Sequence, residues 1–233
     1  MTAPALAAAN AGLAATSTVE VELKLLAPDG EPLRLLARRR RLGSARLGPL
    51  TRVTEVDRYL DTADGRLAAA GWACRLRTRD ATTIVSLKGP AAPQADDGGP
   101  GAGIHRRPEL EGPAGAVTDP RAWPRSAAGA LLMALSGGLP LTERFVLHQR
   151  RSQRPVHVGA RRAGVLTLDR VRIMHRRRLM GSLWSVELEL TAGSDASGLP
   201  SSLLAALRTV PGLRPDPLSK LQHAEALLPR APG

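Results

Sequence analysis

The feature that most constrains this chain is a set of segments in which charged and apolar residues alternate. A period of two is typical of strands whose two faces meet different surroundings. In most of these segments one face is apolar and the other carries Glu, Arg or Lys. The segments are residues 19–25, 73–79, 83–88, 105–111, 145–151, 165–171 and 183–190. The pattern predicts a β-rich α+β chain with seven or eight strands.

Helices and loops are expected between these strands. Helices are expected near 31–41, 65–70 (short), 125–136, 201–209 and 219–228, and the last three show an apolar spacing of three to four residues. The uncharged, Ala-rich residues 1–17 predict a disordered tail, and residues 91–103 and 191–200 predict loops. The length of 233 residues favours a single domain over residues 18–229.

The glutamates are distributed unevenly along the chain. Six of the ten lie in Glu-x-Glu pairs, which are Glu20/Glu22, Glu109/Glu111 and Glu187/Glu189. Two carboxylates on one strand face lie only about 7 Å apart and repel each other unless a cation lies nearby. Any one such strand could simply face water. Three acidic pairs among Arg-bearing and Lys-bearing strands favour a shared interior that holds both signs of charge.

An eight-stranded antiparallel barrel, closed with its charged faces inward, would form a polar tunnel. Buried charges must be paired or must bind a metal ion. Carboxylate clusters suit Mg²⁺ or Mn²⁺, and arginine forks bind phosphate oxygens. The net charge of +12 also favours an anionic partner. The interior therefore suits a metal-bound chain of phosphates.

Composition bears on the cellular compartment. The single cysteine, Cys74, excludes an internal disulfide and a cysteine-cluster zinc site, and suits a reducing cytosol. The N-terminal residues lack the basic residues of a secretory signal or a mitochondrial presequence, and no apolar run approaches the ~20 residues of a membrane span. We expect a cytoplasmic protein without a membrane partner.

Eight short motifs, in order along residues 19–228, resemble those of the CYTH domain, the core of the triphosphate tunnel metalloenzymes. They are the Glu-x-Glu-x-Lys segment at 19–24 and the later segments 58–62, 71–77, 86–90, 107–111, 168–169, 187–190 and 219–220. The chain has 30 Arg but only three Lys, and all three Lys occupy positions where that family has Lys. Val165, Val171 and Ser185 depart from the family pattern at positions where it has Glu, Gly and often a third Glu.

The resemblance implies a tunnel-shaped barrel with flanking helices that hydrolyses a linear triphosphate, such as inorganic tripolyphosphate, with Mg²⁺ or Mn²⁺. It implies catalytic roles for Lys24, Lys88 and Glu22. The expected phosphate-binding residues are Arg75, Arg77, Arg107, Lys220 and one of Arg150 and Arg151. The expected metal ligands are Glu20, Glu22, Asp169, Glu187 and Glu189, with Glu109 and Glu111 as further tunnel acids.

Other functions remain open at this stage. A thiamine triphosphatase, an adenylate cyclase or an RNA triphosphatase would share the fold, and Trp72 or Trp123 could serve as an aromatic platform for thiamine. A non-catalytic module that binds polyphosphate or nucleic acid would suit the basic charge, although the chain lacks the exposed aromatic residues typical of nucleic-acid binding. We expect a small-molecule triphosphate as the substrate, no nucleic-acid partner, and a monomer or homodimer.

Overall fold

The structure is a computed structural model that describes residues 18–90, 103–191 and 199–229. The predicted tail and most of the two predicted loops lie outside these ranges. The chain divides into two compact units. Of the described residues, unit 1 contains 18–19, 55–90 and 107–147, and unit 2 contains 20–54, 103–106, 148–191 and 199–229.

Eight long strands make up most of the sheet. They are β1 (Thr18–Ala27), β4 (Thr51–Thr62), β5 (Ala73–Arg79), β6 (Thr82–Lys88), β7 (Ile104–Pro113), β8 (Leu141–Val158), β9 (Arg161–His175) and β10 (Arg178–Leu190). They pair in the order β8-β4-β5-β6-β7-β1-β10-β9, and β9 also pairs with β8, so the order closes. The predicted class, a closed eight-stranded antiparallel α+β barrel with flanking helices, is confirmed.

The remaining elements are short strands and helices. The short strands are β2 (Arg41–Leu42) and β3 (Ala45–Leu47), which extend the sheet from β8, and β11 (Arg214–Pro215), which pairs with β1. The helices are α2 (Glu31–Arg38), α3 (Arg66–Ala69), α4 (Ala127–Ser136), α5 (Leu199–Arg208), α6 (Lys220–Glu225) and the 3₁₀ turn η1 (Pro120–Ala122). Each of the five predicted helices is present, and α2 ends three residues early because Arg39 is extended.

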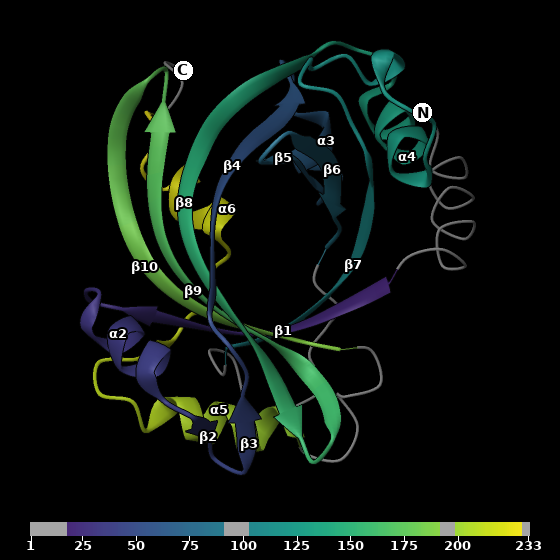
Figure 1. The fold of residues 1–233 in the computed structure, drawn as a ribbon. Coiled ribbons are helices and arrows are strands. Elements are labelled where there is room, and N and C mark those ends of the chain that lie inside the picture. The colour runs from purple at the N-terminus through teal and green to yellow at the C-terminus, as the bar shows by residue number, and fades with distance from the viewer. Residues whose placement is uncertain (1–17, 91–102, 192–198, 230–233) are drawn as a thin grey trace. The chain divides into compact units, whose positions relative to one another are not determined.

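In unit 1, β5 pairs with both β4 and β6, and α3 and α4 pack beside β5 and β6 (Figure 1). The core between the strands and these helices contains Leu76, Leu87 and Leu132, all fully buried. Ser126 begins α4 by accepting a hydrogen bond from the backbone of Gly129, and Gly137 ends it in the left-handed conformation that glycine adopts readily. One sheet face of unit 1 is therefore apolar and covered by helices.

In unit 2, β10 pairs with β1 on one side and with β9 on the other (Figure 1). The apolar side chains of these strands form one core with α2 and α5, which contribute Leu36 and Leu207. Along β1, Leu23 and Leu25 belong to this core and are fully buried. The intervening charged residues consequently lie on the face that points away from the helices.

Strand β4 extends further than the sequence pattern predicts. The motif at 58–62 identifies only its end, whereas the strand begins at Thr51. Strands β8, β9 and β10 are also longer than expected, since their hairpins continue beyond the alternating segments. The added part of β4 carries two acidic residues that prove important for unit 1.

Candidate active site

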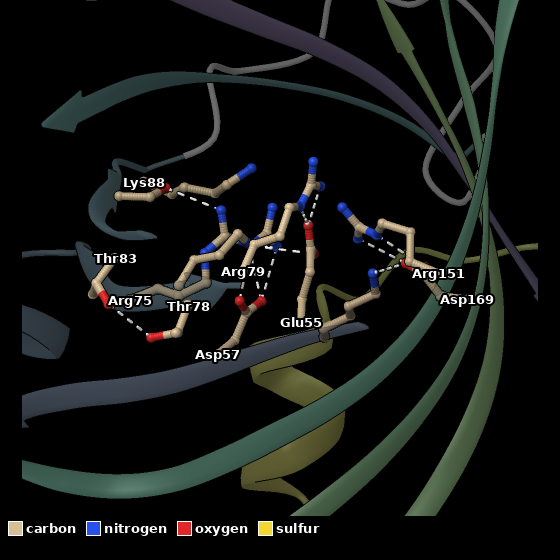
Figure 2. A network of polar contacts seen from close by, with 12 residues as sticks. Glu55, Asp57, Arg75, Thr78, Arg79, Thr83, Lys88, Arg151 and Asp169 are labelled. Atoms are coloured by element: carbon tan, nitrogen blue, oxygen red, sulfur yellow. Dashed lines mark hydrogen bonds and ion pairs between the residues drawn. The ribbon is translucent and has the colours of Figure 1, made fainter. Parts of the chain in front are cut away.

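Three arginines of β5 share one face of unit 1 and are held by acids of β4 (Figure 2). Arg77 donates two hydrogen bonds to Asp57, from Nε to Oδ1 and from Nη2 to Oδ2, both at 2.8 Å. Arg79 donates from Nε to Glu55 Oε1 at 2.9 Å. The antiparallel register explains this, because it places Asp57 opposite Arg77 and Glu55 opposite Arg79. The guanidinium groups are thus fixed before any ligand arrives.

The carboxylates of Glu55 and Asp57 are both fully buried. A buried carboxylate is stable only with cationic or hydrogen-bonding partners, and the arginines of β5 supply them. The sequence predictions missed these two residues. A signal was present, since Glu55-x-Asp57 is an acidic pair of the same spacing as the three Glu-x-Glu pairs. A search that allowed Asp in place of Glu would have found it.

A second chain of contacts links β5 to β6 and β7. Arg75 Nη2 donates to Ser86 Oγ at 3.2 Å, and Ser86 Oγ donates to Glu109 Oε1 at 2.6 Å. Lys88 Nζ lies 3.4 Å from the same Glu109 oxygen, and Arg75 Nη1 lies 3.4 Å from Asp57 Oδ2. Arg75 is buried, while Lys88 and Glu109 are only partly exposed. Four of the sequence-predicted site residues, Arg75, Arg77, Lys88 and Glu109, therefore belong to one network in unit 1.

The other two predicted residues of β7 lie at the edge of this network. Glu111 is opposite Ser86 in the register, but it is exposed to solvent. Arg107 is half-buried on the same strand. We define the unit 1 cluster as Glu55, Asp57, Arg75, Arg77, Arg79, Ser86, Lys88 and Glu109.

In unit 2 the acidic residues of β1 and β10 lie on neighbouring strands. Lys24 is opposite Glu187, and Glu22 is opposite Glu189. Lys24 Nζ lies 2.9 Å from Glu22 Oε1, and both residues are 4% exposed. The lysine thus compensates the charge of the first acidic pair, as the repulsion argument requires.

Asp169 of β9 is held by Arg151 of β8, as Figure 2 shows, and by Lys220. Arg151 donates to its two oxygens from Nε at 2.9 Å and from Nη2 at 2.8 Å, and Lys220 Nζ approaches Oδ2 at 2.5 Å. Burial by itself would raise the pKa of Asp169, but Lys220 and Arg151 outweigh it and lower that pKa to about 2. Asp169 is therefore ionised at neutral pH.

Lys220 also contacts Glu187, whose Oε2 lies 3.0 Å from Nζ. Burial is the largest single effect on the pKa of Glu187 and raises it, whereas the positive charges of Lys220 and Lys24 lower it, and the net direction is downward. A single ammonium group therefore bridges two carboxylates. We define the unit 2 cluster as Glu22, Lys24, Arg151, Asp169, Glu187 and Lys220.

The position of Lys220 depends on the first turn of α6. Ser219 begins this helix, and its side chain and that of Gln222 each bond to the other's backbone NH group. His223 Nε2 lies 2.9 Å from Asp216 Oδ2, and Asp216 is itself tied through its backbone NH to the Lys24 carbonyl. The sequence predictions missed Asp216 and His223, which carry no spacing signal and act only through the folded chain.

Three further predicted residues lie outside the unit 2 cluster. Of the two arginines considered for β8, Arg151 belongs to the cluster and Arg150 is exposed. Glu20 is half-buried and Glu189 is exposed. The departures from the family pattern also have defined places: Ser185 lies opposite Asp169, and Val165 lies opposite Glu189.

Within the described ranges, no three His, Cys, Asp or Glu residues converge as ready metal ligands. The donor set nevertheless fits Mg²⁺ or Mn²⁺, because it consists of carboxylate oxygens and because a cation, the Lys220 ammonium, already bridges Asp169 and Glu187. Mg²⁺ commonly uses one or two carboxylates together with substrate phosphates and water. Glu22 and Glu187 are two such carboxylates, on the neighbouring strands β1 and β10.

Cys74 and Asp61 have structural roles. Burial raises the pKa of the Cys74 thiol to about 12, and the residue packs in the core of unit 1. Asp61 accepts hydrogen bonds from the backbone of Thr62, Leu67 and Ala68, and so joins the end of β4 to α3. Among the described residues, no helix is long and apolar enough to cross a membrane.

Solved structures with a similar fold come from distant organisms. The Hippeastrum protein HpAC1, described as having a dominant triphosphatase activity, is 20% identical and has a TM-score of 0.64, with 90% of this chain and 98% of that chain covered. An adenylate cyclase candidate from Bacillus halodurans is 18% identical with a TM-score of 0.58, over 89% and 97% of the two chains. A Pyrococcus horikoshii protein is 17% identical with a TM-score of 0.54, over 89% and 98%.

These structures share the fold, and at such low identity they establish nothing finer. Among curated proteins, none matches this chain significantly. The sequence pattern of one family, the CYTH domain, matches residues 18–223. That match covers most of the 233 residues and includes both clusters. The chain therefore belongs to the CYTH domain family.

Proposed function

We propose that this protein is a divalent-metal-dependent triphosphatase that hydrolyses inorganic tripolyphosphate to pyrophosphate and phosphate. The observation that carries the proposal is the unit 1 cluster, in which buried carboxylates hold a row of guanidinium groups on one strand face. A protein that used these arginines only for stability would gain little from burying so many charges. Binding of a polyanionic substrate would explain the arrangement, because these guanidinium groups can bind its phosphate oxygens.

Phosphate binding is assigned to Arg75, Arg77, Lys88 and Arg107 in unit 1 and to Arg151 and Lys220 in unit 2. A guanidinium group has five N–H donors, and Asp57 engages only two of those of Arg77. The remaining donors can bind phosphate oxygens while Asp57 keeps the fork in place. Preorganisation of this kind spares the entropy cost of ordering long side chains upon binding.

The metal is assigned to Glu22 and Glu187, with Glu20, Glu189 and Asp169 as further oxygen donors. When bound, Mg²⁺ or Mn²⁺ would neutralise phosphate charge and polarise the phosphorus–oxygen bond. Glu187 is paired with the Lys220 ammonium at 3.0 Å and with Arg151 at 3.7 Å, and substrate phosphates can attract the ammonium away. The pKa values of Asp169 and Glu187 are lowered, so both carboxylates are ionised at neutral pH.

The chemistry requires in-line attack of water on a terminal phosphorus atom. The bridging P–O bond breaks, pyrophosphate leaves with the bonding electrons, and the water proton passes to a carboxylate and then to solvent. We assign the catalytic role of Glu22 to holding the metal ion, and charge stabilisation on the phosphoryl and leaving oxygens to Lys24 and Lys88. Positioning and electrostatics, rather than covalent catalysis, supply the rate in this scheme.

The structure favours an inorganic substrate over thiamine triphosphate. Trp72 and Trp123, the two indoles considered as aromatic platforms, are only 8% and 7% exposed and pack within the core of unit 1. Neither offers a free ring face for a thiazolium or pyrimidine group. A linear inorganic chain needs only cations and metal ligands, which both clusters contain.

The test is phosphate release from tripolyphosphate, thiamine triphosphate, ATP and GTP, each with Mg²⁺, Mn²⁺ or EDTA. We expect tripolyphosphate to be the fastest substrate and EDTA to abolish turnover. Glu22→Gln and Lys24→Met should each lower kcat by at least about 100-fold, while the exposed-arginine variant Arg172→Gln should keep full activity. Circular dichroism checks that each variant folds.

Three results would refute the proposal: turnover that survives EDTA, full activity in Glu22→Gln, or metal-independent binding of nucleic acid without phosphate release. The last would favour a non-catalytic binding module. We also propose a cytoplasmic location and a monomer or homodimer, which cell fractionation and light scattering of the purified protein can examine.

A further inference from the structure

A pocket of about 530 Å³ lies in unit 2 beside α2, which is labelled in Figure 1. Its walls come from α2, β4, β8, β9 and β10, and its apolar part includes Leu33, Val53 and Leu168. This volume lies within the range of ordinary small-molecule sites, about 300–1,000 Å³. Of the residues assigned to the two clusters, Arg151 alone also lines this space.

The pocket lies on the opposite sheet face from the unit 2 carboxylates. Leu168 and Arg170 line it, whereas Asp169 between them belongs to the cluster. In the same way Trp184 lines the pocket and precedes Ser185, which lies opposite Asp169. Because successive side chains of a strand point to opposite faces, the pocket is a site distinct from the cluster.

The charged residues that line the pocket are all positive. Five arginines line the pocket and no acid does; they are Arg34, Arg52, Arg150, Arg151 and Arg170. Arg34 is neutralised by Glu31 and Arg151 by Asp169. Within the described ranges no carboxylate forms an ion pair with Arg52, Arg150 or Arg170, all of which are exposed. Three positive charges thus converge without a counter-charge, which favours an anionic ligand.

An indole ring forms part of the same wall. The guanidinium carbon of Arg170 lies 5.2 Å from the centroid of the Trp184 ring, a cation–π contact. Gly30 packs against the other part of the indole, where a Cβ atom would come within 3.1 Å of the ring. The ring is therefore held in place, and together with Leu33 and Leu168 it offers a flat apolar surface to a planar group.

We propose that this pocket binds a nucleoside monophosphate, with its phosphate on Arg52, Arg150 and Arg170 and its base against Trp184 and the leucines. A phosphate monoester carries nearly two negative charges, and arginine forks match its oxygens. The apolar half of the lining distinguishes this ligand from inorganic phosphate, which could use only the arginines. The proposal concerns binding alone and does not depend on the triphosphatase activity.

The experiment is a titration of the full chain with adenosine 5′-monophosphate in EDTA, followed by tryptophan fluorescence. We expect saturable quenching that disappears in Trp184→Phe, because Trp72 and Trp123 lie in the core of unit 1. Calorimetry on Trp184→Phe should still detect binding, which separates loss of signal from loss of the site. Inorganic phosphate and adenosine, titrated separately, should each bind at least about tenfold more weakly.

A matched pair of variants locates the site. Arg170→Gln should weaken binding about tenfold, the loss expected for one charge-assisted hydrogen bond. Arg172→Gln removes the next exposed arginine on the same face of β9, outside the pocket lining, and should change binding less than about twofold. Neither variant should alter triphosphate hydrolysis.

The proposal fails if quenching does not saturate, or if inorganic phosphate binds as tightly as the nucleotide. It also fails if Arg172→Gln weakens binding as much as Arg170→Gln, since a diffuse basic surface would then account for the affinity. Because these failures concern binding equilibria measured without metal, they leave the triphosphatase proposal unaffected.

Discussion

Replacing Lys220 with methionine removes the one ammonium group that bridges two carboxylates of unit 2. Its Nζ lies 2.5 Å from Asp169 and 3.0 Å from Glu187, with only 10% of the side chain exposed. Removing one partner of a buried ion pair typically costs about 3–5 kcal/mol, because the remaining charge stays desolvated. Arg151 still neutralises Asp169 in the variant. We therefore expect the free energy of unfolding to fall by about 3 kcal/mol, the lower end of that range.

The assay is thermal and urea denaturation in EDTA near neutral pH. For a chain of this size a loss of about 3 kcal/mol corresponds to a fall in Tm of about 6–12 °C. The control is Arg214→Met, which removes an exposed cation from the same unit and should change the stability by less than about 0.5 kcal/mol. A Tm within about 2 °C of the parent would refute the reasoning.

The pH dependence gives an independent check. The pKa of Asp169 is about 2 in the folded protein and 3.8 ordinarily, so its ionised form stabilises the fold above pH 3.8. This contribution, roughly 2 kcal/mol, is lost as the pH falls through the folded value near 2. In Lys220→Met the folded pKa of Asp169 rises, so the stabilities of the parent and the variant should approach each other as the pH falls from about 4 to about 2. A stability difference that stays constant from about pH 3 to pH 7 would contradict this account.

Four further changes probe other parts of the structure. Asp57→Asn should destabilise the fold by about 3 kcal/mol in urea and raise KM for triphosphate, because Arg77 loses the carboxylate that orients it. Arg154→Met should cost about 3 kcal/mol by the same measurement, since this buried arginine donates to five backbone carbonyls. Ser185→Ala should be neutral or stabilise by up to about 1 kcal/mol, because the buried Ser185 Oγ has no hydrogen-bond partner within the described residues. Cys74 should resist alkylation at about pH 8 until the protein is unfolded, since its pKa is about 12; rapid labelling of the native protein, followed by mass spectrometry, would contradict this.

The strand pattern and the acidic pairs predicted a β-rich fold with a charged interior, and the family resemblance supplied the order of the motifs that name most residues of the two clusters. The reason is physical: a period of two fixes which side chains share a face, and the repulsion within each Glu-x-Glu pair demands cations nearby. Lys24 beside Glu22 and Lys88 beside Glu109 meet that demand. The sequence could not choose between Arg150 and Arg151, because the choice depends on which face of β8 each occupies.

The residues that sequence reasoning missed act through register or tertiary contact. Glu55 and Asp57 matter because β4 pairs with β5 in a register that brings them opposite Arg79 and Arg77. Asp216 and His223 matter because they secure the turn before α6. The linear sequence does not indicate which residues either pair contacts. The pocket beside α2 likewise forms only when five separate elements come together in the fold.

The use of lysine in this chain has a consistent explanation once the contacts are known. Each of the three lysines forms an ion pair with a carboxylate of the two clusters: Lys24 with Glu22, Lys88 with Glu109, and Lys220 with Asp169 and Glu187. Arginine serves elsewhere, including where a planar fork binds a carboxylate through two N–H groups, as Arg77 and Arg151 do. An ammonium group is compact and can turn between neighbouring oxygens, whereas a guanidinium group holds one fixed geometry. In the proposed reaction some cations must release a carboxylate and bind a phosphate oxygen during each turnover, and an ammonium group suits these positions. A guanidinium group suits the positions where the contact stays fixed. Lys→Arg substitutions at these three positions should therefore impair turnover more than they impair folding.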